Sequence, residues 1–274
     1  MIEIKDLSFS YGNNAVLENI SLNLENGRVY GLLGENGVGK TTLLTLLCGL
    51  KKPDTGTIRV DGHEPYRRLS SSLCSQYFLP DDVMAYNLPA ESFAKFSGKF
   101  WPKFEIDKFN RIMDEFETET DQKMNRMSAG QLKKTYIAFA LACNPDYLFM
   151  DEPTNGLDIP SKAQFRKAVT LYTEEDSTVV ISTHQVRDLE NIIDPIIILD
   201  KRDVLVNAST EKISEKLYFD YGNVLHPDAL YSEQLPGGFI QVTLNPEGLE
   251  SKVNIEALFN AVHHHKELIK SLFE

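Results

Sequence analysis

The sequence feature that most constrains this chain is the stretch 34–42, which reads G-E-N-G-V-G-K-T-T. It matches the pattern G-x-x-x-x-G-K-[ST], in which glycines let backbone N–H groups turn inward around phosphate oxygens. A short, β-prone apolar run precedes it at 28–33, and leucines at helical spacing follow it between 43 and 50. The sequence therefore predicts a strand, a phosphate-binding loop and a helix, in that order.

This loop predicts a nucleoside triphosphate site in which backbone and side chains have separate tasks. The N–H groups and the positive end of the following helix attract the phosphates. Lys40 adds a charge for the β- and γ-phosphates, and Thr41 offers a hydroxyl to Mg²⁺, which prefers hard oxygen ligands. We therefore expect ATP to contact Gly34, Glu35, Asn36, Gly37, Val38, Gly39, Lys40, Thr41 and Thr42.

The composition narrows the classes of protein to which this chain can belong. With 274 residues it can form one domain of roughly 200 residues and a small appendage. Its formal charge of -12 argues against a general nucleic-acid surface, which needs clustered Lys and Arg, so no nucleic-acid partner is expected. The three cysteines are odd in number and widely spaced, so we expect reduced, buried thiols at Cys48, Cys74 and Cys143.

The sequence shows no sign of membrane insertion or secretion. No apolar run approaches the ~18 residues that a membrane-spanning helix needs. The N-terminus, M-I-E-I-K-D, alternates charged and aliphatic residues where a signal peptide would have an apolar segment. We therefore expect a cytoplasmic protein that reaches the inner face of the cell membrane only through a partner.

Three later stretches place polar groups at the ends of regular elements. The stretch 127–131, M-S-A-G-Q, starts a strongly periodic helix, where a hydroxyl and free N–H groups form an anion site. The stretch 146–152, D-Y-L-F-M-D-E, is an apolar strand that ends in Asp151 and Glu152. A carboxylate in such a position can hold Mg²⁺ through water. A further strand, 177–183, ends just before His184.

Taken in order, these motifs resemble those of the ABC-type ATPases over residues 1 to about 217. The family's L-S-G-G-Q signature is similar to M-S-A-G-Q here, and the D-E pair with the P-T-N-G-L-D tract at 153–158 resembles the family's Walker B motif and D-loop. The resemblance implies an α/β fold, in which a P-loop NTPase core carries an antiparallel β subdomain and a helical subdomain at about 79–145. It also implies hydrolysis of the β–γ bond of MgATP between two subunits.

The resemblance also assigns roles to single residues around ATP. Tyr11 would stack on the adenine, with Val16 beside it. Glu152 would polarise the attacking water as general base, and His184 would contact the γ-phosphate and orient Glu152. Gln76 would reach the metal and the attacking water. The implied catalytic residues are Glu152, His184, Gln76 and Lys40, and the implied metal ligands are Thr41, Gln76 and Asp151.

In this family the signature closes over ATP bound by the loop of a second subunit, so that the nucleotide joins a head-to-tail dimer. Ser128, Gly130 and Gln131 keep the family pattern, whereas Met127 and Ala129 replace a leucine and a glycine. Asp158 in the D-loop would signal across the same dimer. The second subunit could be another copy of this chain or a different chain.

Between 79 and 125 the aromatic content rises, at spacings that suit short amphipathic helices. Two interpretations stay open for these aromatic side chains. They could form the core of a helical subdomain, or some could form a docking surface for a membrane-embedded partner, together with exposed residues of 80–83. The aromatic residues are Phe93, Phe96, Phe100, Trp101, Phe104, Phe109 and Phe116.

Residues 218–274 extend beyond the resemblance and predict a small α+β appendage. The stretches 230–232 and 239–244 suggest a small sheet, and the apolar spacing from 255 to 273 predicts one helix. Adjacent histidines at 263–265 point in different directions on a helix, so a solvated helix face is favoured over a metal site. The appendage could pack on its own ATPase core, meet its twin in a dimer, or regulate.

The function expected from the resemblance is the ATP-hydrolysing subunit of a membrane transporter, whose dimerisation drives a separate transmembrane subunit. The acidic residues that follow Gln76, the D-E-P-T-N-G-L-D tract and the appendage look more like export ATPases than like nutrient importers. Two soluble functions stand as alternatives. A metallocluster-assembly ATPase would share every motif, whereas an ATPase that acts on DNA or the ribosome usually has two ATPase domains or long coiled coils. The sequence identifies no transported substrate.

Overall fold

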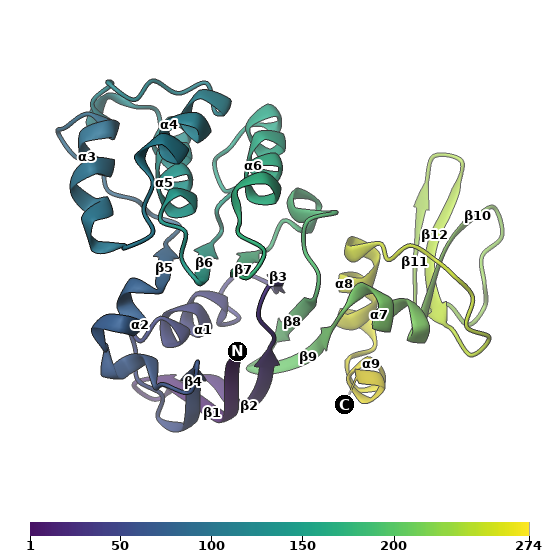
Figure 1. The fold of residues 1–274 in the computed structure, drawn as a ribbon. Coiled ribbons are helices and arrows are strands. Elements are labelled where there is room, and N and C mark those ends of the chain that lie inside the picture. Colours follow the sequence, from purple (N-terminus) through teal and green to yellow (C-terminus); the bar gives the residue numbers. More distant parts are fainter. Residues whose placement is uncertain (274) are drawn as a thin grey trace.

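A central six-stranded sheet organises the computed structural model, which describes residues 1–273 (Figure 1). Its strand order is β5-β6-β7-β3-β8-β9, and all pairings are parallel except that of β8 with β9. Every residue of β6, β7 and β8 is buried because other elements cover both faces. The strands are β3 (Val29–Leu33), β5 (Gln76–Leu79), β6 (Tyr147–Asp151), β7 (Thr178–Thr183), β8 (Ile196–Asp200) and β9 (Asp203–Ala208). The predicted, mainly parallel α/β core is confirmed.

Helix α1 (Lys40–Leu47) starts at the end of the phosphate loop and packs against the core sheet. Its four leucines between 43 and 47 are buried, as their helical spacing predicts. The chain then turns at Gly49, which has a φ of 68°, and Leu50 beyond the turn is 53% exposed. The predicted helix is therefore correct as far as residue 47, whereas its extension to Leu50 is wrong.

A three-stranded antiparallel sheet of order β2-β1-β4 packs over α1 and confirms the predicted β subdomain. Its strands are β1 (Ile2–Tyr11), β2 (Asn14–Leu24) and β4 (Thr55–Val60). Alternate side chains of β1 and β2 point inward and join the leucines of α1 in one hydrophobic cluster. Because α1 continues directly from the phosphate loop, this cluster fixes the position of the loop's carboxyl-terminal end.

Helices α3 (Ala90–Ser97), α4 (Ile106–Glu115) and α5 (Ala129–Ala142) form the helical subdomain at one end of the molecule (Figure 1). Helix α6 (Ile159–Tyr172) lies beside α5, and the short α2 (Ser70–Cys74) leads into β5. The aromatic side chains of this segment are partly core and partly surface. Phe109 and Phe116 are fully buried, whereas Phe96 and Phe100 are 68% and 66% exposed.

The C-terminal appendage is a small sheet with helices beside it, and two details of the prediction were wrong. Strand β10, which had no clear sequence signal, pairs with β12 to give the order β10-β12-β11. The predicted single helix is two helices, because the backbone leaves the helical region at His265 (φ -131°, ψ 50°). The elements are α7 (Thr210–Lys216), β10 (Leu217–Gly222), β11 (Tyr231–Leu235), β12 (Gly238–Leu244), α8 (Ile255–His264) and α9 (Lys266–Phe273).

The appendage packs on the ATPase core of its own chain, an arrangement that the sequence left open. Helix α8 lies against the turn Val186–Leu189, which follows His184, and α9 lies against β9. Apolar side chains of both helices belong to the same buried cluster as the core sheet. The histidines are divided between solvent and core: His264 and His265 are exposed, as a solvated helix face predicts, whereas the half-buried His263 lies near Asp200. No cluster of three metal-ligating side chains occurs in residues 1–273.

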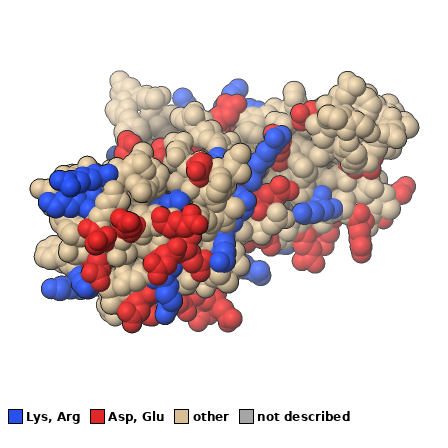
Figure 2. Space-filling model, turned by 90° about the horizontal axis from the view of Figure 1, so that it is seen from above, with Lys and Arg blue, Asp and Glu red and all other residues tan. Residues whose placement is uncertain are grey.

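The surface charges are mixed, and two of the three cysteines are buried. Figure 2 shows basic side chains scattered among acidic ones rather than gathered in one tract on the face that it presents. Cys48 and Cys143 are buried and free, Cys74 is half-buried, and burial raises the pKa of the Cys143 thiol well above its usual range. Across residues 1–273, none of the helices has the length and apolarity required to cross a bilayer.

Candidate active site

The loop from Gly34 to Gly39 joins β3 to α1, and its glycines allow a backbone that other residues resist. Gly37 and Gly39 have φ angles of 80° and 115°, in the left-handed region that favours glycine. A Cβ on Gly39 would also lie 3.0 Å from Leu17 and 3.1 Å from Val16. No side chain caps the start of α1, so its first N–H groups can receive an anion.

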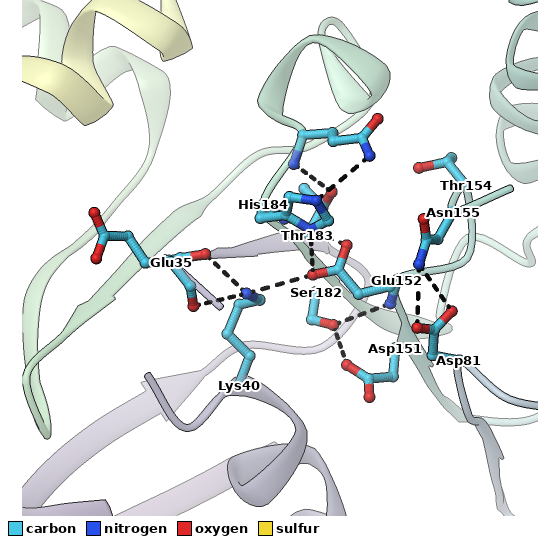
Figure 3. Close-up of polar contacts among 12 residues, drawn as sticks. Glu35, Lys40, Asp81, Asp151, Glu152, Thr154, Asn155, Ser182, Thr183 and His184 are labelled. Atoms are coloured by element: carbon cyan, nitrogen blue, oxygen red, sulfur yellow. Dashed lines mark hydrogen bonds and ion pairs between the residues drawn. The ribbon is translucent and has the colours of Figure 1, made fainter. Parts of the chain in front are cut away.

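Lys40 holds its ammonium group over this loop. The side chain is almost fully buried, and Nζ donates to the carbonyls of Gly34 at 2.8 Å and Glu35 at 3.1 Å. Nζ also lies 3.3 Å from Oε1 of Glu152 (Figure 3). Phosphate oxygens would compete with Glu152 for this charge, because both are anionic.

Thr41 and Asp151 form a candidate metal site. The Thr41 hydroxyl donates to Oδ2 of Asp151 at 2.6 Å, and the Ser182 hydroxyl donates to Oδ1 at 2.5 Å. Asp151 ends β6 and pairs with Ser182 of β7, so parallel strands bring both groups to one sheet edge. A hydroxyl and a carboxylate side by side suit Mg²⁺, which takes few protein ligands and completes its shell with water and phosphate. The residues present therefore fit Mg²⁺.

Glu152 is held in a strained conformation between a cation and a histidine. Its φ of 44° is unusual for a residue other than glycine, and its N–H donates to the carbonyl of Ser182 at 3.1 Å. The carboxylate accepts from the N–H of His184 at 3.3 Å, and Nδ1 of His184 lies 2.9 Å from Oε1 without alignment for a hydrogen bond. Figure 3 shows Lys40 and His184 converging on Glu152. A carboxylate placed in this way can polarise a water molecule.

A cavity of about 630 Å³ joins these groups to Tyr11. Tyr11 is half exposed; its hydroxyl lies 3.3 Å from the hydroxyl oxygen of Thr42, and the ammonium of Lys51 lies 4.7 Å from its ring centre. A ring at the rim of a phosphate cavity can stack on a base. The cavity is lined by Tyr11, Asn14, Val16, Asn36, Gly37, Gly39, Lys40, Thr41, Thr42, Pro80, Asp81, Asp82, Asp151 and Glu152. Glu35 and Val38 face a neighbouring cavity instead.

Gln76 lies outside this cavity, and its predicted role at the metal is wrong. It is the first residue of β5, not the last, and β5 runs parallel to β6, so Gln76 stands at the sheet edge opposite Asp151. Its buried amide donates to the carbonyl of Cys48 at 3.1 Å. Residues 73–74 belong to helix α2, so the strand begins at Gln76 and its carboxyl end lies beyond Leu79.

Four residues that line the cavity were not predicted to contact ATP: Asn14, Pro80, Asp81 and Asp82. Among them, Asp81 has the most side-chain contacts in the site. It follows the carboxyl end of β5, where the run Y-F-L-P-D could have been taken as a strand that ends in a carboxylate. Its Oδ1 lies 3.0 Å from Nζ of the buried Lys133 of α5, and its Oδ2 accepts from Asn155 at 3.2 Å (Figure 3). The stretch 80–83, considered above for partner contacts, thus turns residues 80–82 toward the nucleotide cavity.

The two partners of the Asp81–Lys133 pair should respond differently to mutation. Asp81→Ala leaves the buried Lys133 ammonium without its carboxylate, so we expect a loss of about 1–2 kcal/mol, below the value for a fully buried pair because Asp81 is 40% exposed. Lys133→Met leaves a carboxylate that water can reach, so we expect a smaller loss. Urea unfolding of both variants tests this order, and a larger loss for Lys133→Met would contradict it.

The signature residues Ser128, Gly130 and Gln131 stand together, apart from the phosphate loop of the same chain. Ser128 caps α5: its hydroxyl accepts from the N–H of Gln131 at 3.2 Å, and Oε1 of Gln131 accepts from the N–H of Ser128 at 2.9 Å. A Cβ on Gly130 would meet only the Gly156 carbonyl, at 3.8 Å. Within the described chain, none of the three residues lines the cavity around Lys40.

Asp158 also lies outside that cavity, at the start of α6. Its carboxylate caps the helix by accepting from the N–H of Ser161 at 2.9 Å. Hydrogen bonds from Ser161 hold the pKa of Asp158 below its ordinary value. The next residue, Ile159, is 84% exposed. A contact of Asp158 with a second subunit remains a prediction.

The fold and this site together define a P-loop nucleoside triphosphatase with an inserted helical subdomain. Comparison with known proteins narrows the class. The family model described as "ABC transporter" matches residues 17–155, which is half of the chain. The chain belongs to the ABC transporter family, and it is an ATP-binding ATPase.

Several curated relatives cover most of the chain. The bacitracin transport ATP-binding protein BcrA of Bacillus licheniformis is 32% identical over 79% of this chain and 72% of its own length. The daunorubicin/doxorubicin resistance ATP-binding protein DrrA of Streptomyces peucetius is 30% identical over 79% of this chain and 67% of its own length. The ABC transporter ATP-binding protein YtrB of Bacillus subtilis is 28% identical, again over 79% of this chain and 74% of its own length.

Solved structures confirm the fold. An ATP-binding subunit of an ABC transporter superposes with a TM-score of 0.70 and 24% identity, over 78% of this chain and 91% of that chain. A dimeric ATP-binding cassette in a post-hydrolysis state, bound to ADP and Pi, gives a TM-score of 0.67 and 24% identity, over 76% of this chain and 98% of that chain. The predicted ABC-type fold is therefore confirmed.

Proposed function

We propose that the chain hydrolyses MgATP with the groups at the carboxyl edge of its sheet. Lys40 and the loop N–H groups would bind the β- and γ-phosphates, and Thr41 and Asp151 would hold Mg²⁺, which would neutralise charge as the β–γ bond breaks. Glu152 would polarise the attacking water, and His184 would keep Glu152 oriented. The observation that carries this proposal is the convergence of Lys40 and His184 on Glu152.

We infer that the active form is a head-to-tail dimer. Ser128 and Ala129 are exposed, Gly130 and Gln131 are half-buried, and all four lie outside the cavity of their own chain, so they can meet the phosphates bound by another subunit. The start of α5 also presents N–H groups suited to an anion. One solved relative is a dimeric cassette in two separate structures, which supports the same assembly here.

We propose that a separate transmembrane subunit docks at an apolar groove between the core and the helical subdomain. The groove has a volume of about 570 Å³ and is lined by residues of α2 and β5 together with Leu50, Phe100 and Trp101. Leu50 and Phe100 are more than half exposed. Exposed apolar side chains that border a groove are typical of protein interaction sites. A helix of the transmembrane subunit would bury them and hold the chain at the inner face of the membrane.

We propose export as the direction of transport. The relatives DrrA and BcrA are named for drug resistance and bacitracin transport, and a relative from Ralstonia nicotianae is named for Nod factor export. Two relatives from Bacillus subtilis, each 28% identical, are named for petrobactin import and zinc uptake. The export proposal therefore rests on relatives named for resistance and export, at similar identity to the importers.

The proposed partner can be captured directly. We would purify the tagged chain from detergent-solubilised membranes of its native host and identify the proteins that accompany it. A stoichiometric protein with several membrane-spanning helices is the expected result. Soluble assembly proteins alone would instead support a metallocluster-assembly ATPase.

The groove can be tested by placing a charge inside it. Phe100→Asp should reduce recovery of the membrane partner at least ~10-fold, because a buried charge opposes an apolar contact at the centre of an interface. Leu171→Asp is the matched control, since Leu171 is 58% exposed on α6 and lies outside the groove. Equal recovery with Phe100→Asp, or equal loss with Leu171→Asp, would argue against this docking site.

A further inference from the structure

Asp200 is a buried carboxylate at the end of the strand that flanks the phosphate loop. It is the last residue of β8 and is 4% exposed. Strand β8 runs parallel to β3, with Ile198 opposite Leu33, so the two strands end at the same edge of the sheet. The loop passes so close to β8 that a Cβ on Gly34 would lie 2.6 Å from the carbonyl oxygen of Leu199. The end of β8 is therefore a packing support for the start of the loop.

The charges that balance Asp200 come from the C-terminal appendage. Nζ of Lys266, the first residue of α9, lies 2.5 Å from Oδ2, and Nδ1 of His263 on α8 lies 3.8 Å from Oδ1. Over residues 1–273, no ion pair joins Asp200 to the ATPase core itself. A buried carboxylate is costly unless it is paired. The core thus depends on the appendage to keep Asp200 buried.

The same groups border the phosphate loop. A cavity of about 500 Å³ is lined by loop residues 35–38, by residues 200–202 at and after the end of β8, and by His263 and Lys266 of the appendage, together with residues 14–16. Figure 3 shows the yellow C-terminal helices on the side of the site toward which Glu35 points. The appendage therefore forms part of the wall of a cavity that the loop also lines.

We propose that Lys266 is a positioning residue for ATP. By pairing with Asp200 it holds the end of β8 against Gly34, and so keeps the loop in the shape that binds phosphates. When this pair breaks, the Asp200 carboxylate turns toward water, the end of β8 moves with it, and the loop loses its support on Leu199. A partner that displaced the appendage helices would weaken ATP binding by the same route. The proposal rests on ATP binding alone and does not depend on transport or dimerisation.

The test compares Lys266→Met in the full chain with a matched substitution elsewhere in the appendage. We expect the KM for ATP to rise roughly 2- to 30-fold, the range of 0.5–2 kcal/mol observed for coupled networks, with kcat within about twofold of the parent value. The Kd for an ATP analogue with an imido bridge between the β- and γ-phosphates should rise in parallel. Lys266→Arg keeps the charge and should restore both values. Lys252→Met removes another lysine contact with the core, to Asn191, and should change neither.

The same Lys266→Met substitution in an Asp200→Asn variant shows whether Lys266 acts through Asp200 or whether its loss disturbs the structure in general. In Asp200→Asn the carboxylate charge is gone, so adding Lys266→Met should change the KM by less than about twofold. This comparison also serves if Lys266→Met alone does not fold, because the double variant leaves no unpaired charge. An unchanged KM in folded Lys266→Met, an equal rise in Lys252→Met, or a full rise in the Asp200→Asn background would each overturn the proposal.

Discussion

Replacing Glu152 with glutamine should reduce steady-state ATP hydrolysis by roughly 10²- to 10⁴-fold while ATP binding persists. Glutamine has nearly the same shape, so the contact with the N–H of His184 can remain, but the charge that polarises the attacking water is lost. Phosphate release measures the rate, and titration calorimetry measures ATP affinity. Glu115→Gln is the matched control, because Glu115 lies on α4 and pairs with Lys167 outside the cavity.

The same variant tests the proposed dimer. If the signature of one copy closes over ATP bound by the other, Glu152→Gln should elute as a dimer with MgATP and as a monomer without it. A bulky charge at the signature, Ser128→Arg, should prevent this dimer when it is added to Glu152→Gln. Equal monomer populations with and without ATP would rule out closure by the signature of a second subunit, while full activity in Glu152→Gln would remove Glu152 as the base.

Lys40→Met should weaken ATP binding roughly 10- to 150-fold, the equivalent of 1.5–3 kcal/mol for a hydrogen bond to a charged group. The ammonium already lies within hydrogen-bond reach of the carbonyls of Gly34 and Glu35, over the loop that would hold the β- and γ-phosphates. Methionine fills a similar volume but offers no charge and no donor. Calorimetry with the imido analogue of ATP measures the loss without interference from hydrolysis.

The control for this variant is Lys103→Met, which removes a surface lysine that pairs with Asp146. It should bind ATP with the affinity of the parent chain. Thermal unfolding of both variants shows whether they remain folded, since Lys40→Met also leaves Glu152 without its nearest cation. Parent-like ATP affinity in a folded Lys40→Met variant would show that the charge of Lys40 is not needed to bind ATP.

Most of the fold could be predicted because its signals are local. The strand, glycine loop and helix at 28–47 lie within one short stretch, and alternating or helical spacing of apolar residues marks β1, β2 and α5. Strand β10 was missed because an edge strand with mixed burial has a weak pattern. The break between α8 and α9 was missed because the apolar spacing continues through His265, although the backbone does not.

The candidate site was predictable where a residue's place follows from its neighbours in the chain. Lys40 and Thr41 continue the loop, and Asp151 and Glu152 end a strand that the sequence shows clearly. Gln76 and Asp81 could not be distinguished in this way. Which of them faces ATP depends on where β5 starts and on its parallel pairing with β6, and both are set by contacts between distant segments.

By itself, the sequence determined the phosphate loop, the order of strands and helices around it, and an ATPase of the ABC type, because short motifs carry their chemistry with them. Only the tertiary structure decided that Asp81 rather than Gln76 enters the cavity, and that Lys266 of the appendage pairs with Asp200 beside the loop. The physical reason is that a charge can be assigned to a cavity or a partner only when the packing of distant segments is known. Distant segments are brought together by burial and strand pairing, and the spacing of residues along the sequence does not show which segments will meet.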